Sequence, residues 1–168
     1  VVSLATHLAA HMAKDNLSAA LGESGTNRTM ADLLGLDGID ITTEVPINLN
    51  TTEATANGAS KYALVLGAFS QWDRDDDTSD ANAFVQRLEA DATDADGLST
   101  ATLTQAMRNL VAGDSAAGGN ARGANSPVES VNMALGTGAS NFVAATGVEI
   151  TGAASITVGG SASFKASV

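Results

Sequence analysis

The chain lacks cysteine altogether and has few aromatic and few basic residues. The absence of cysteine from its 168 residues excludes a disulfide framework and thiolate chemistry. Eight Lys and Arg against 19 Asp and Glu give a net charge of −11. This charge argues against nucleic acid or an anionic membrane surface as a partner, because either needs a basic face. No apolar run approaches the roughly 20 residues of a membrane span.

What remains is a chain of one-domain size that is rich in small residues. Aromatic residues make up 4% of it and glycines number 17, whereas the hydrophobic fraction of 44% is enough for a core. No signal peptide is visible and the first residue is Val1. We therefore expect a processed product or a piece of a longer polypeptide.

Helical spacing of apolar residues dominates the first 140 positions. The first predicted helix covers 4–21 and ends at Gly22, and the second covers 26–35 with Thr26 or Asn27 as its cap. A third covers 59–72, and a fourth begins after a cap at Ser79 or Asp80. The last two cover 98–111, capped by Ser99, and 127–136. The most apolar is 59–72, and we expect it to be the central core helix through Tyr62, Val65, Leu66, Phe69 and Trp72. The Gly-, Ala- and Ser-rich stretch 112–126 is predicted to be a loop.

The C-terminal stretch "GVEITGAASITVGGSASFKASV" alternates strictly, with apolar residues at even positions. This pattern predicts strands over 148–158 and 163–168 around a Gly159-Gly160 turn. The predicted contacts with a core or a neighbouring subunit are Val148, Ile150, Ile156, Val158, Phe164 and Val168. The fold class expected is therefore a mainly α-helical domain, 1–140, followed by a short C-terminal β segment, 141–168, which makes the chain α+β overall.

Two strands alone do not make a stable sheet in water, so the C-terminal strands need partners. Within the chain, 39–47 alternates as an edge strand or a loop containing Pro46, and together with 142–144 it offers a way to close a small sheet. The other source is a neighbouring subunit, which would complete the fold by strand addition. Head-to-tail use of such a contact generates open filaments.

An acidic stretch, "WDRDDDTSD", is the first candidate metal site. Asp73, Asp75 and Asp77 place hard oxygen ligands at alternate positions, which suits Ca²⁺. An EF-hand loop starting at Asp73 needs Gly at its sixth position and Glu at its twelfth, where this chain has Thr78 and Phe84. The EF-hand is therefore excluded, and a looser calcium site and a solvated acidic loop both stay open.

A histidine pair is the second candidate. His7 and His11 are four residues apart, so on a helix both can reach one metal ion. The sequence identifies no third ligand, and such a pair is more typical of a surface or the edge of a core. No G-x-S-x-G elbow, recognisable catalytic triad or phosphate-binding loop is present. We therefore expect no enzymatic activity.

Two parts of the chain resemble known bacterial sequences. The tail "VEITGAASITVGGSASFKASV" resembles the first two strands of a bacterial immunoglobulin-like domain of the second group. The stretches "SLATHLAAHMA", "LLGLDGIDITTEVPI" and "KYALVLGAFSQW" are similar to helical modules of large surface and secreted proteins of Gram-negative bacteria.

These resemblances imply a non-catalytic, extracellular structural or adhesion subunit of a bacterial surface fibre. Its partners would be other copies of itself or neighbouring domains of the same surface protein, associated through the C-terminal strands. The alternative is a calcium-dependent module of a large adhesin that binds a sugar or a peptide, with the acidic stretch holding Ca²⁺.

Overall fold

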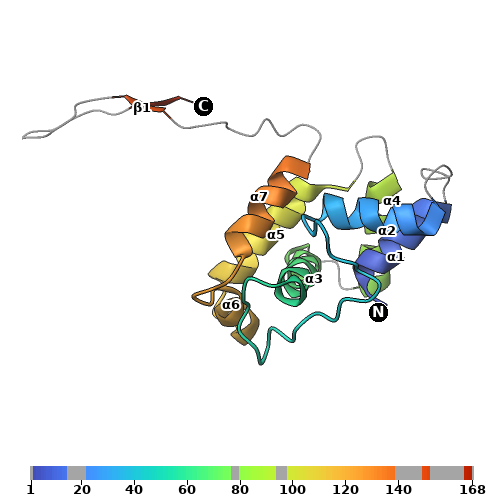
Figure 1. Cartoon of the computed structure of the whole chain (residues 1–168), viewed down its shortest axis with the longest axis horizontal. Helices are drawn as coiled ribbons and strands as arrows, with labels where there is room; N and C mark the ends of the chain where they lie inside the picture. Colours follow the sequence, from blue (N-terminus) through green and yellow to red (C-terminus); the bar gives the residue numbers. More distant parts are fainter. Residues whose placement is uncertain are drawn as a thin grey trace, which may run out of the picture.

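The structure is a computed structural model that describes residues 2–14, 22–76, 80–93, 98–138, 149–151 and 165–167. In these ranges the chain forms the helices α1 (Leu4–Lys14), α2 (Gly22–Leu33), α3 (Gly58–Asp75), α4 (Ala81–Thr93), α5 (Thr100–Ala112), α6 (Ala116–Ala121) and α7 (Val128–Gly138), and the strands β1 (Glu149–Thr151) and β2 (Lys165–Ser167). The chain is mainly helical, as the apolar periodicity predicts (Figure 1).

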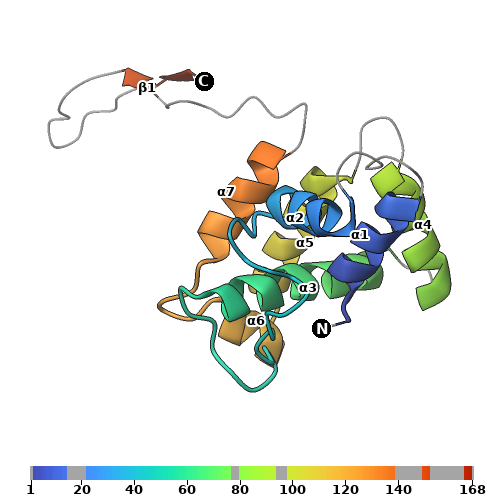
Figure 2. The same ribbon diagram turned by 45° about the vertical axis from the view of Figure 1, so that its right-hand side comes forward.

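Helix α3 lies at the centre of the helical part. It packs against α5 and α7, while α1 contacts both α2 and α4 (Figures 1 and 2). Asn57 caps its N-terminus by accepting a 2.8 Å hydrogen bond from the Ser60 N–H. The cap fixes where this helix begins, and its broad apolar face produces the spacing from which the sequence predicts it.

The predicted core residues of α3 are buried to different degrees. Tyr62, Val65 and Phe69 are at most 2% exposed, whereas Leu66 and Trp72 are only partly buried. Neighbouring helices cover more than one face of α3, so Leu64 and Ala68 are also fully buried. One hydrophobic cluster joins α3 to the other helices, and its largest fully buried members elsewhere are Leu8, Met30, Leu34, Leu36, Ile41, Leu88, Leu103, Met107 and Leu135.

Several predicted helix ends are wrong. Gly22 begins α2 instead of ending the preceding helix, so Thr26 and Asn27 lie inside α2 and not at its start. At the other end of the chain, α7 continues past Gly136 to Gly138. Asp80 is confirmed as the start of α4, because its Oδ1 accepts a 2.9 Å hydrogen bond from the Asn82 N–H.

The loop predicted over 112–126 contains the short helix α6. Ser115 caps it by accepting a 3.0 Å hydrogen bond from the Gly118 N–H. A Cβ at position 118 would lie 2.4 Å from the carbonyl oxygen of Leu110, so only glycine lets α6 approach the end of α5 this closely. Gly118, one of the glycines from which the loop was predicted, therefore allows α6 to pack against the end of α5.

Of the two alternatives for 39–47, the loop is confirmed: the segment has a turn at 41–43 and forms no strand. Asp40 Oδ1 accepts hydrogen bonds from the Thr42 N–H at 2.9 Å and the Thr42 hydroxyl at 2.6 Å. These bonds from Thr42 lower the pKa of Asp40. Such a turn removes 39–47 as a partner strand, and 142–144 lies outside the described residues.

In the tail, β1 pairs antiparallel with β2, with Ile150 opposite Ala166 and Glu149 opposite Ser167. Even positions therefore face even positions, as the alternation requires. The rest of the predicted strands lies outside the described residues, including Val148, Ile156, Val158, Phe164 and Val168. In the part of the chain that is described, no helix has the length and apolar character needed to cross a membrane.

Tyr62, the only tyrosine of the chain, ties α3 to two other segments. Its hydroxyl donates a 3.2 Å hydrogen bond to the Ile41 carbonyl oxygen and shares a short hydrogen bond with the Ser3 hydroxyl. Burial raises the pKa of Tyr62, and the hydrogen bond with Ser3 acts in the opposite direction.

This pKa shift predicts a loss of stability at alkaline pH. Because the folded pKa is raised, the stabilisation is fully present below the unfolded value of about 10 and is lost as pH rises through the folded pKa. Urea unfolding from about pH 8 to about pH 11, with tyrosinate absorbance as the titration probe, measures it. Tyr62→Phe should cost about 1 kcal/mol at neutral pH and reduce the alkaline loss. An unchanged alkaline loss in Tyr62→Phe would contradict this assignment.

Candidate functional site

Helices α1 and α4 bring three titratable side chains together. His7 and His11 lie one turn apart on α1, and Glu89 lies on α4, which packs alongside. His7 Nε2 is 2.7 Å from Glu89 Oε1, and His11 Nε2 is 3.8 Å from Glu89 Oε2. Both imidazoles therefore approach the same carboxylate, one at each oxygen.

This group lies at the rim of the core. The side chain of His7 is 50% exposed, that of His11 26% and that of Glu89 21%. All three side chains are therefore partly exposed to solvent, and His7 is the most exposed of them. The placement agrees with the core-edge interpretation of the histidine pair, and it adds a carboxylate that the sequence did not identify.

The acidic residues at the end of α3 bond to neighbouring helices. Asp75 Oδ1 accepts a 2.7 Å hydrogen bond from Gln71 Nε2, and its Oδ2 accepts one of 2.7 Å from Asn109 Nδ2 of α5. Asp76 forms an ion pair with Arg87 of α4, and its hydrogen bond is the main cause of the raised pKa of Arg87. These carboxylates therefore connect α3 to both α4 and α5.

The predicted calcium ligands that the structure describes differ in their exposure to solvent. Asp75 is exposed, Asp73 is partly buried, and Asp77 lies outside the described residues. Among the residues that are described, no group of three or more His, Cys, Asp or Glu side chains is placed so that it could hold a metal ion. Because Asp77 cannot be placed, calcium binding by this stretch stays a prediction.

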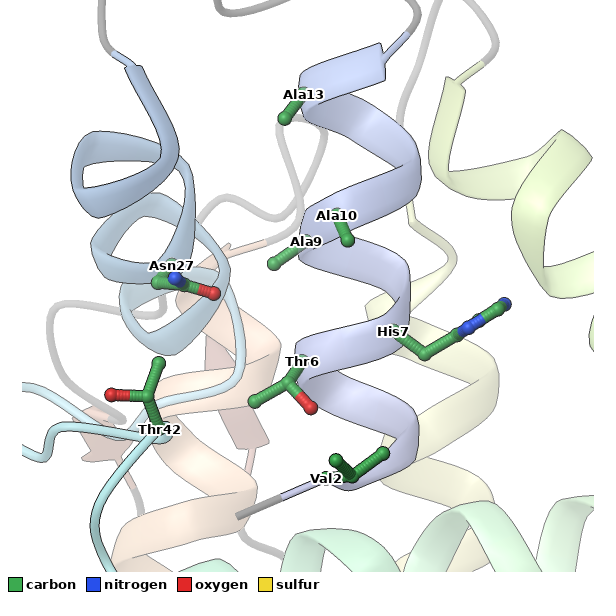
Figure 3. A pocket seen from close by; sticks show the side chains of 8 residues that line it. All are labelled: Val2, Thr6, His7, Ala9, Ala10, Ala13, Asn27 and Thr42. Carbon is green, nitrogen blue, oxygen red and sulfur yellow. The ribbon is translucent and has the colours of Figure 1, made fainter.

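A hollow of about 470 Å³ lies between α1, α2 and the turn at Thr42. Small side chains line most of it, and in Figure 3 Thr6, Ala9 and Ala13 of α1 face Asn27 of α2 and Thr42, whereas His7 points away on the other side of α1. The lining residues are Val2, Thr6, His7, Ala9, Ala10, Ala13, Asn27 and Thr42. Because His7 points away, this lining does not pair a nucleophile with a base.

Glu89 is the residue of this site that sequence reasoning missed. It lies 82 positions from His7, and no local motif connects it to the histidines. Only the packing of α4 against α1 brings it there. The helical spacing predicted that His7 and His11 can both reach one metal ion, whereas the structure places a carboxylate against both.

Comparisons of the chain with protein-family models, with curated proteins and with solved structures found no match.

Proposed function

We propose that the chain is a non-catalytic structural subunit of an extracellular bacterial surface fibre, joined to neighbouring copies by its C-terminal strands. The observation that carries this proposal is the antiparallel pairing of β1 with β2 behind a helical part that has its own core. The bacterial immunoglobulin-like pattern of the tail supports the extracellular location.

The helical part has no need of the tail to bury its apolar residues. Its hydrophobic cluster runs from Ala5 to Leu135 and includes residues of all seven helices, with Ala117 and Ala121 representing α6. The tail does need a partner, because a pair of strands is only marginally stable in water without further strands or a packed face. The partner that the tail needs is therefore proposed to come from another copy.

The alternation of the tail specifies which residues face that partner. Ile150 belongs to the apolar, even-numbered row, and Thr151 belongs to the polar row. A slip of one residue in register would exchange the two rows, so the register should be tightly fixed. A lysine at 150 should therefore disturb association far more than a lysine at 151.

Light scattering coupled to size-exclusion chromatography tests this proposal. The full chain should associate as its concentration rises, and deletion of 159–168 should abolish association while leaving the helical circular dichroism intact. Ile150→Lys should weaken association, and the matched control Thr151→Lys should leave it unchanged. A truncated chain that associates like the full one would overturn the proposal.

A further inference from the structure

We propose that Asn50 is an acceptor site for N-linked glycosylation, with Asn50, Thr51 and Thr52 as its recognition motif. The motif is an asparagine, then any residue except proline, then a serine or threonine, and it has to lie in an accessible surface segment to be used. This proposal rests on the extracellular location proposed above, because N-linked sugars are typical of secreted proteins.

Asn50 lies in an exposed turn that is fixed at both ends. Asn50 and the two threonines that follow it are exposed, whereas Leu49 and Ala54 on either side of them are buried. Asn120 of α6 holds both of these neighbours. Its Nδ2 donates a 2.6 Å hydrogen bond to the Leu49 carbonyl oxygen, and its carbonyl oxygen accepts one of 2.9 Å from the Ala54 N–H. The fold therefore presents the motif at a defined place on the surface.

The bonds inside the turn leave the acceptor amide unused. Asn48 Oδ1 accepts a 3.0 Å hydrogen bond from the Asn50 N–H. The Asn48 carbonyl oxygen accepts bonds of 3.0 Å from the Thr51 N–H and 2.9 Å from the Thr52 N–H. Within the described residues, the side-chain amide of Asn50 makes no hydrogen bond. An enzyme can therefore engage this amide by opening a single exposed turn, which costs little because the turn is at the surface.

A second copy of the motif, Asn27-Arg28-Thr29, lies in a different setting, inside α2. Asn27 lines the hollow between α1 and α2 and faces α1 there (Figure 3). The Thr29 hydroxyl donates a 3.0 Å hydrogen bond to the Gly25 carbonyl oxygen. An enzyme could take this motif only by unwinding a helix that packs against α1. Asn27 is therefore a matched negative control within the same chain.

The transfer needs an activated sugar and an enzyme, and the chain supplies the amide. Asn50 Nδ2 attacks the anomeric carbon of a sugar that is activated as a glycosyl phosphate. The new carbon–nitrogen bond forms as the bond from that carbon to the phosphate oxygen breaks. The phosphate leaves with the electron pair, and Nδ2 releases one of its two protons. Nucleotide-activated sugars and lipid-linked oligosaccharides are both donors of this chemistry.

Incubation of the folded, full chain with UDP-glucose and an N-glycosyltransferase that takes this motif tests the site. Cleavage after glutamate then places Asn27 in the peptide 24–44 and Asn50 in the peptide 45–53. A third motif, at Asn16, lies outside the described residues and is separated in the peptide 1–23. We expect the mass of a hexose on 45–53 and not on 24–44. If the chain is cleaved before incubation, both peptides should be modified, because α2 no longer protects Asn27.

Two variants separate the motif from the turn. Thr52→Ala destroys the motif and should abolish the addition to 45–53, whereas Thr52→Ser should retain it. Thr51→Ala changes the neighbouring exposed threonine, keeps the motif and should also retain the addition. Circular dichroism should be the same for all of these variants. A folded chain without hexose on 45–53, or with equal addition at Asn27 and Asn50, would overturn the proposal.

A peptide map of the chain recovered from the cell surface identifies the donor. One or a few hexoses on 45–53 would indicate a nucleotide-activated sugar, and a larger preassembled glycan would indicate a lipid-linked oligosaccharide. An unmodified Asn50 on a chain from the cell surface would contradict the glycosylation site alone. A chain that carries the sugar and does not associate would support the site and contradict the fibre.

Discussion

Replacing Phe69 by Ala should lower the free energy of unfolding by about 3–5 kcal/mol. Phe69 is 2% exposed on the central helix α3, so its ring is almost fully buried in the core. It stacks on Trp72 with ring centroids 6.5 Å apart, and Trp72 meets Phe84 of α4 edge-on at 5.9 Å. The substitution therefore leaves a cavity and also removes support from the aromatic contact between α3 and α4.

Urea unfolding followed by circular dichroism measures this loss, because the fluorescence of the single Trp72 would itself respond to the missing ring. Met133→Ala on α7 is the matched control. Met133 is 71% exposed, and its truncation should change stability by less than about 0.5 kcal/mol. A Phe69→Ala variant as stable as the control would contradict the central position of α3.

Gly35→Ala should cost about 2–5 kcal/mol, for two separate reasons. Gly35 has a φ of +66°, and a left-handed conformation costs a residue with a Cβ about 1–2 kcal/mol. In addition, the new Cβ would lie 2.5 Å from the Cβ of Ala134 on α7. Overpacking of this kind costs about 1–3 kcal/mol. The turn after α2 can therefore approach α7 only because position 35 has no side chain.

A substitution at Gly38 measures the conformational cost without the overpacking cost. Its φ of +75° is also left-handed, but nothing lies within 4 Å of a Cβ built there. Gly38→Ala should therefore cost only the conformational part, about 1–2 kcal/mol. Thermal or urea unfolding of the two variants gives the difference directly. Equal costs at 35 and 38 would show that α7 does not pack against the turn as described.

The sequence predicted elements whose causes are local and missed those whose causes are tertiary. Helix α3 has a cap at Asn57 and a continuous apolar face, so its pattern and its structure agree. Helix α6 depends on the close approach of Gly118 to Leu110, which no local pattern reveals. The alternation in 39–47 left a strand and a loop open, and the structure shows the loop, with a turn over 40–43 that leaves Ile41 buried and Val45 69% exposed.

In the candidate site, too, the sequence predicted the local feature and missed the one that depends on tertiary packing. The four-residue spacing of His7 and His11 predicts that the two lie on one side of a helix, which the structure confirms. The group that they contact is a matter of packing, because Glu89 reaches the histidines only through the contact of α4 with α1. For the tail, the alternation predicted two strands around a glycine turn, and β1 pairs with β2 so that Ile150 lies opposite Ala166.

Amide hydrogen exchange of the full chain at increasing protein concentration tests the central claim most directly. The account predicts that α3 and α5 are protected at every concentration, because their shared core needs no partner. It also predicts that protection of 148–158 and 163–168 rises with concentration, as neighbouring copies supply the missing strands. Protection of the tail that is the same at every concentration would contradict the claim, because its partner would then lie in the same chain.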